Sequence, residues 1–193
     1  MAVPSTPLGT PANVLTTIGP GQLWVADFGT GAAEAAIINS SGALPTGATG
    51  FRMIGYTDDG TEFSYALSVD NIVVAEEIEA VGVVPTAVDM QVVFTLAEAT
   101  GQNLQFALNN GNATVGAGAQ IVTPVAGQEK LVTIVQESPS GARWVFRKCI
   151  QGGTTGVQWK KAPDKHQIAA EFHLMKVDTN PTIKVFASAA STV

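Results

Sequence analysis

The sequence predicts a mainly-β protein: a β-sandwich or barrel with one short flanking α-helix, an extended N-terminal arm and a long inter-strand loop. Three observations predict this class. Short segments that alternate polar and apolar residues recur along the chain, 20 glycines and 10 prolines separate them, and one segment has helical spacing. Residues 1–20 are expected to form the arm and residues 21–193 a single β-sandwich domain.

The N-terminal arm is predicted from the four prolines in residues 1–20 and from the lack of any sustained hydrophobic period. Such an arm is either disordered or becomes ordered against a neighbouring molecule. Its apolar side chains favour docking: Leu8, Val14, Leu15 and Ile18.

The first half of the domain is expected to contain strands at residues 22–28, 51–56 and 62–69, with a loop over residues 29–50. Asp59-Gly60 is a tight-turn signal and separates the second strand from the third. Residues 62–69 alternate for eight positions, which predicts a half-buried strand.

Residues 70–88 have no clean period. Ile78 and Val81 could share a short helical turn, but Gly82 and Pro85 favour a long excursion between two strands. Strand character then resumes over residues 88–96.

A short helix is predicted over residues 101–108, capped by Thr100, with Leu104, Ala107 and Leu108 on the face that covers a sheet. Residues 111–119 are expected to be a flexible connection. A hairpin of residues 130–137 and 143–150 follows, and then come strands at residues 156–161, 167–177 and 182–187.

The charge distribution is uneven. Only 13% of residues are charged; residues 1–100 carry eleven acidic side chains against Arg52 alone, whereas residues 101–193 carry five acidic and nine basic side chains. Weakly charged surface and complementary halves suit the pairing of identical copies. The alternative is that folding mixes the two halves and no surface dipole remains.

The sequence does not predict an enzyme, and we expect no catalytic, cofactor-binding or metal site. Cys149 cannot form an intrachain disulfide and is expected to be buried, His173 to be a structural strand residue, and His166 to be solvated. No nucleophile-elbow, zinc-protease or phosphate-loop motif occurs. No signal peptide or membrane span is recognised, so a cytoplasm-like setting is expected.

Two charged clusters have alternative interpretations. The glutamates of the long loop could hold a hard cation, but a solvated acidic loop is favoured: Glu76, Glu77 and Glu79. A basic patch beside Trp159 could meet phosphates, but a subunit–subunit or solvent role is preferred: Lys160, Lys161, Lys165 and His166.

Residues 1–110 resemble the major tail tube proteins of long-tailed (siphovirus-type) bacteriophages. The resemblance is carried by the proline-containing arm, by residues 21–26 (GQLWVA) and by residues 55–63 (GYTDDGTEF). It continues with the excursion, residues 92–98 (VVFTLAE) and a short helix. Beyond residue 110 only the architecture agrees, and the excursion has aliphatic residues where such proteins often carry Trp.

The resemblance implies a structural virion protein that forms stacked hexameric rings, the tail tube through which DNA passes into the host. It implies assembly in the host cytoplasm, residence in the virion tail, no cofactor and no membrane contact. The implied partners are further copies, the tape measure protein, tail terminator and tip proteins, and transient non-specific contact with viral DNA in the lumen. The long loop would stack the rings and the N-terminal arm would dock between subunits; the loop residues are Asp70, Asn71, Glu76, Glu77, Glu79, Val83 and Pro85.

The acidic first hundred residues further suggest a net negative bore, because lysine and arginine along the lumen would bind phosphates and retard the DNA. The main alternative function is a capsid decoration or a tail-tip module that binds carbohydrate or protein. Such a module would expose clusters of Trp or Tyr, whereas Trp24, Trp144 and Trp159 mostly lie in strand patterns.

Deleting residues 71–85 should leave folded subunits that no longer polymerise, because this segment lies outside the predicted core strands. Negative-stain electron microscopy checks the outcome. Tubes of normal appearance would contradict the assignment of the loop to stacking.

Overall fold

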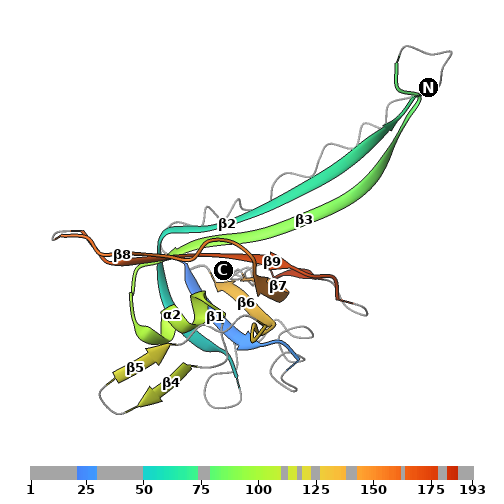
Figure 1. The fold of residues 1–193 in the computed structure, drawn as a ribbon. Coiled ribbons are helices and arrows are strands. Elements are labelled where there is room, and N and C mark those ends of the chain that lie inside the picture. Colours follow the sequence, from blue (N-terminus) through green and yellow to red (C-terminus); the bar gives the residue numbers. More distant parts are fainter. Residues whose placement is uncertain are drawn as a thin grey trace, which may run out of the picture.

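The computed structural model describes residues 21–29, 50–73, 79–109, 113–116, 119–122, 127–137, 143–161, 164–177 and 182–186. Within these ranges the chain forms ten strands and one short helix (Figure 1), which confirms the mainly-β prediction. The helix is α2, Gly101–Ala107. The strands are β1 Gln22–Asp27, β2 Arg52–Ile72, β3 Gly82–Leu96, β4 Ala113–Gly116, β5 Ala119–Val122, β6 Val132–Glu137, β7 Arg143–Gln151, β8 Gly156–Gln158, β9 Gln167–Leu174 and β10 Ile183–Phe186.

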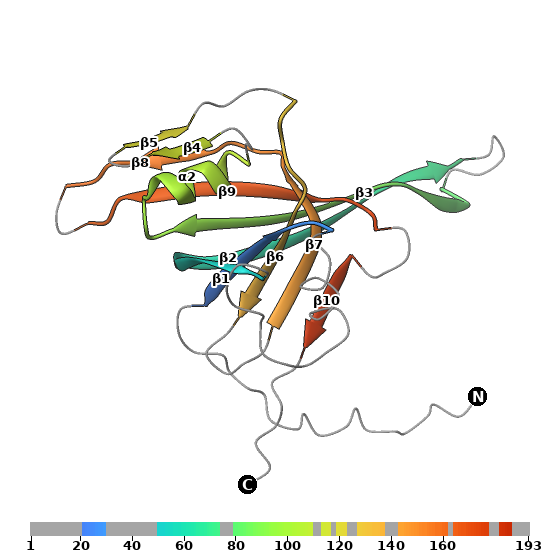
Figure 2. The same ribbon diagram turned by 90° about the horizontal axis from the view of Figure 1, so that it is seen from below.

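The main sheet is antiparallel and closes on itself. Its strand order is β10-β7-β6-β1-β2-β3-β9-β8, and β7 also pairs with β9, so six strands form a closed cycle. Figure 2 shows β8, β9 and β3 across one side of the molecule and β1, β6, β7 and β10 on the other. Strands β4 and β5 form a separate two-stranded sheet near α2.

A bulge in β7 makes the closure possible. Lys148 has φ 52°, and the register with β6 shifts between Val132↔Cys149 and Ile134↔Phe146, so that β7 holds one extra residue. Bulges bend a strand and increase its twist. The first part of β7 therefore pairs with β10 and its last residues with β9.

The core is aromatic where the helix meets the sheet. Phe94 of β3, Phe106 of α2 and Phe172 of β9 stack on one another, with ring centroids 5.0 to 6.1 Å apart. Aromatic pairs at these separations stabilise beyond the area they bury. The surrounding cluster is contributed by β1, β2, β3, β6, β7 and β9, and its side chains include Leu23, Ile54, Val92, Leu96, Ile134, Cys149 and Ile168.

The predicted helix is confirmed, with a rotated face. The side chain of Thr100 accepts a hydrogen bond from the Asn103 amide, which is the expected N-cap. Asn103, Phe106 and Ala107 are buried and Leu104 packs against the core, so Asn103 and Phe106 join the predicted Leu104 and Ala107 on the covering face. Leu108 caps the helix and is half-buried. The side-chain amide of Asn103 donates hydrogen bonds to the Ile54 and Glu98 carbonyls, and these bonds hold Asn103 on the buried face of the helix.

The Asp59-Gly60 turn prediction is wrong, because this pair lies within β2. Thr57 pairs with Leu96 and Thr61 with Phe94, so β2 holds two extra residues at this point and bulges without reversing. Gly60 has φ 86°, a left-handed conformation that glycine adopts at no steric cost. The Asp-Gly pair correctly indicated a left-handed residue at Gly60, but the chain does not reverse there and continues as β2.

Two predicted connections are strands. Most of the described excursion over residues 70–88 belongs to β2 and β3, which pair from Val69↔Pro85 to Ile72↔Gly82. Residues 113–116 and 119–122, expected as a flexible connection, pair as β4 and β5. Small residues and glycine concealed the strand pattern of residues 113–116 and 119–122. Pro85 concealed that of residues 82–88. Proline is tolerated there because that edge of β3 is unpaired among the described strands.

Replacing Phe172 with alanine should lower the free energy of unfolding by about 3–5 kcal/mol, because its ring is fully buried against two others. Urea denaturation measures the change. Val185→Ala on β10, where the side chain is half exposed, is the control and should change it by less than about 1 kcal/mol. Equal losses in the two variants would contradict this account of the core.

Candidate functional site

The longest feature of the molecule is an arm made by the distal parts of β2 and β3. We define the arm as residues 64–73 and 79–90. Strand β1 pairs with β2 only up to Tyr56, and β9 pairs with β3 only from Gln91. The arm therefore extends beyond the closed sheet as a two-stranded ribbon (Figures 1 and 2), and among the described strands none pairs with its outer edges.

One face of the arm is apolar. Residues two apart on a strand share a face, and directly paired residues share it across the ladder. Tyr65, Leu67 and Val69 therefore lie on one face. The partners in β3 that share this face are Met90, Val88, Pro85 and, opposite Asn71, Val83.

The apolar face of the arm continues the interior face of the closed sheet. Phe63 pairs with Val92. Both lie at the root of the arm, on the same face as Tyr65. Val92 is fully buried, yet Tyr65 is 57% exposed and Leu67 is 47% exposed. The core face thus runs out of the molecule without a covering layer among the described residues.

The opposite face of the arm is small and polar near the root and exposes Ile72 and Val84 towards the outer end. It carries Ser64, Ala66, Ser68 and Asp70 on β2, opposite Gln91, Asp89, Ala87 and Val84 on β3. The arm is therefore an amphipathic ribbon. A contiguous exposed apolar face of this kind is typical of protein–protein contact surfaces.

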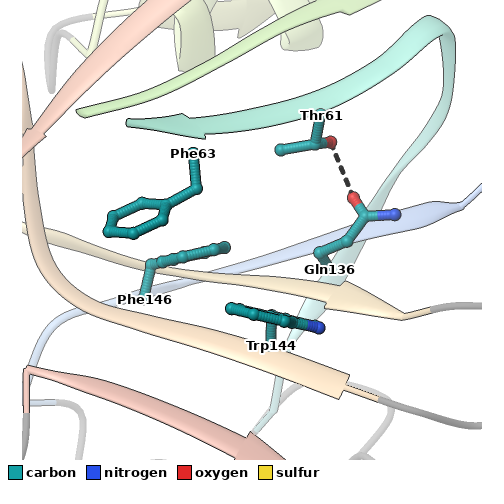
Figure 3. Close-up of a pocket in the computed structure, with 5 residues that line it drawn as sticks. All are labelled: Thr61, Phe63, Gln136, Trp144 and Phe146. Atoms are coloured by element: carbon teal, nitrogen blue, oxygen red, sulfur yellow. Dashed lines mark hydrogen bonds between the residues drawn. The ribbon is translucent and has the colours of Figure 1, made fainter. Parts of the chain in front are cut away.

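A pocket lies where the arm leaves the closed sheet (Figure 3). It has a volume of about 300 Å³ and is lined by Thr61, Phe63, Gln136, Trp144 and Phe146. The rings of Phe63 and Phe146 stack at 5.6 Å between centroids, and the Thr61 hydroxyl is hydrogen-bonded to the Gln136 side chain at 2.7 Å. The lining holds no titratable group, so the pocket is better suited to bind an apolar side chain than to transfer protons in a reaction.

The β2 bulge is tied to β9 by an ion pair. The Lys165 ammonium lies 3.0 Å from one Asp58 carboxylate oxygen, and the Gln167 amide donates to the other. The hydrogen bond from Lys165 is the main cause that lowers the pKa of Asp58. These contacts fix the root of the arm against the start of β9.

A second projection, the basic tip, joins β8 to β9. We define it by its described side chains, Trp159, Lys160, Lys161, Lys165 and His166. The expectation that Trp159 lies in a strand pattern is wrong, because it follows the last residue of β8 and is 78% exposed. His166 is exposed as expected, and its Nδ1 accepts the Lys160 amide.

The prediction of a structural role for His173 agrees with its contacts. Its Nδ1 lies 3.0 Å from an Asp89 carboxylate oxygen, and its Nε2 lies 3.4 Å from one of Glu171. A Cβ on Gly152 would stand 2.2 Å from the His173 ring, so the chain passes this group where only glycine fits.

The single cysteine of the chain lies in the core. Cys149 is fully buried as predicted, and burial raises the pKa of its thiol to about 12. No group of three histidine, cysteine, aspartate or glutamate side chains among the described residues is arranged to hold a metal ion. The described helix α2 is too short to cross a membrane.

The residues assigned to ring stacking gather on the arm. Asp70 and Asn71 are exposed in β2, Val83 and Pro85 are exposed in β3, and Glu79 is exposed just before β3. Glu76 and Glu77 lie outside the described residues. The four positions predicted to dock the N-terminal arm also lie outside them: Leu8, Val14, Leu15 and Ile18. The sequence analysis missed Tyr65, Leu67 and Val88, because alternation looks the same whether the apolar face meets its own core or another chain.

Comparison with known proteins adds no family. No protein-family model matches the chain, and no curated protein matches it in sequence.

Replacing Asp58 with asparagine should lower the urea midpoint more at pH 6 than at pH 2. The folded-state pKa of Asp58 is lowered, so its ion pair stabilises the fold above the usual value of 3.8 and loses this effect as the pH falls through the folded-state pKa. A variant whose midpoint differs equally from wild type at both pH values would contradict this account.

Proposed function

We propose that the chain is a structural subunit that assembles with further copies of itself through the β2–β3 arm. The observation that carries the proposal is the apolar face of the arm, which continues the core face and is uncovered among the described residues. Fully burying an exposed apolar side chain contributes about 1.5–3 kcal/mol, and these side chains, already about half buried in the subunit, would each contribute roughly half of that. Covering several of them can therefore offset the entropy lost on association.

The form of assembly that we propose is the tail tube of a long-tailed bacteriophage, built from stacked hexameric rings. The support is the pattern of strands, short helix and protruding amphipathic hairpin, together with unpaired strand edges that neighbouring copies can complete. The tube would conduct DNA into the host and would meet the tape measure, terminator and tip proteins at its ends.

The charge of the subunit supports a conduit for DNA. Residues 53–129 contain no lysine or arginine, and this stretch spans the arm and α2. An acidic or neutral wall repels the duplex weakly and lets it slide, whereas rows of basic side chains would bind it. We infer a bore of net negative charge on this ground.

A capsid decoration or tail-tip binding module is the second candidate. It is favoured by the exposed Trp159 and by Trp144, which is 43% exposed at the rim of the pocket. Exposed aromatic rings suit sugar or protein ligands. A protein that stays monomeric and binds a glycan would support this candidate.

The double substitution Leu67→Ser and Val88→Ser should abolish assembly while the subunit still folds. The two side chains pair on the apolar face of the arm and are 47% and 51% exposed, so the fold itself loses little. Analytical ultracentrifugation and negative-stain microscopy measure assembly, and circular dichroism measures folding.

The matched control is Ala66→Ser with Ala87→Ser, which changes the opposite face of the same strands and should leave assembly intact. Normal tubes from the Leu67/Val88 variant would overturn the role of the apolar face. A wild-type protein that remains monomeric at high concentration would overturn self-assembly itself.

A further inference from the structure

The acidic character of the arm continues to its outer end. Asp70 and Glu79 are exposed there, and neither lies within ion-pair distance of a basic side chain among the described residues. Glu62 is exposed near the root of the arm, and Asp89 is engaged with His173 and Gln91. The arm thus combines an apolar face with two unneutralised carboxylates towards its end.

The basic tip has the complementary composition. The Lys160 and Lys161 ammonium groups form no close ion pair among the described residues. Lys165 is paired with Asp58, and Lys160 acts on the same carboxylate at longer range. The tip has one described acid, the exposed Asp164. Trp159 adds a large apolar ring, the side chain most enriched among residues that dominate binding energy at interfaces.

The two surfaces cannot meet within one molecule. Figure 1 shows the end of the arm and the end of β8 on opposite sides of the closed sheet, and Figure 2 shows the same separation. Two different complementary patches that face apart form a head-to-tail contact, and repetition of that contact builds a ring or an open helical assembly.

We propose that the basic tip of one copy binds the end of the arm of a neighbouring copy, with Lys160 and Lys161 facing Asp70 and Glu79 and with Trp159 against the exposed Ile72 and Val84, which share the face of Asp70. This inference rests on the proposed self-assembly and adds the partner surface of the arm. A lysine-rich surface with an exposed tryptophan also suits single-stranded nucleic acid. The second copy is favoured because the same chain supplies an acidic and apolar counterpart in equal number.

Charge reversal tests the contact in the full chain. Lys160→Glu with Lys161→Glu should raise the critical concentration for assembly at least tenfold, and Asp70→Lys with Glu79→Lys should do the same. An equimolar mixture of the two variants should assemble again, because each reversed tip then meets a reversed arm. The assembly of the wild-type protein should also weaken as salt is raised.

Controls separate this contact from general effects of charge. Lys176→Glu changes an exposed lysine just after β9 and should leave the critical concentration unchanged. Lys160→Gln with Lys161→Gln removes charge without reversing it and serves if the reversed variant folds poorly. Thermal unfolding confirms that each variant retains the fold.

Each outcome decides the proposal. Wild-type assembly with no change in either double variant would overturn the contact and leave the proposed function standing. A wild-type chain that never assembles would overturn both. If the Lys160/Lys161 variant assembles normally but no longer binds a fluorescent single-stranded oligonucleotide that the wild type binds, the tip is a nucleic-acid surface and the inference is wrong.

Discussion

The interior of the closed sheet is shorter than the two strands that leave it, and this mismatch governs the rest of the molecule. Strands β2 and β3 are 21 and 15 residues long, but their neighbours β1 and β9 pair with only a few residues at the root. Backbone pairing between β2 and β3 continues regardless of what covers their faces. The apolar pattern therefore continues beyond the last residue that the core can bury.

The bulges determine where this mismatch falls. The two extra residues in β2 shift its register at Gly60 and direct the arm away from the closed sheet, while Asp58 anchors the bulge to the start of β9. The bulge at Lys148 lets β7 reach β9 and complete the cycle. A bulge, in which inserted residues bend a strand, therefore accounts for both features: the one in β7 closes the sheet and the one in β2 projects the arm.

A rigid ribbon with one apolar face is well suited to join identical subunits. The ladder orders the backbone before any contact forms, so less entropy is lost on docking than with a disordered loop. The pocket at the root of the arm adds an apolar recess beside the ribbon, lined by Phe63, Trp144 and Phe146. In the proposed contact, charge would then select the partner, because complementary patches on opposite sides of one chain favour ordered head-to-tail contacts over random aggregation.

Local periodicity and capping chemistry were sufficient to predict the mainly-β class, the positions of β1, β6, β7 and β9, the capped helix and the burial of Cys149, because these features depend on neighbouring residues. The sequence set apart the outer part of the arm, residues 70–88, as an excursion, but it predicted residues 62–69 to be a half-buried strand. Three features became visible only in the folded chain: residues 57–61 bulge and do not turn, residues 70–72 and 82–88 are paired strands, and Leu67 and Trp159 are exposed. These depend on which strand lies opposite and on where the core ends, and neither is encoded in the alternation of neighbouring residues.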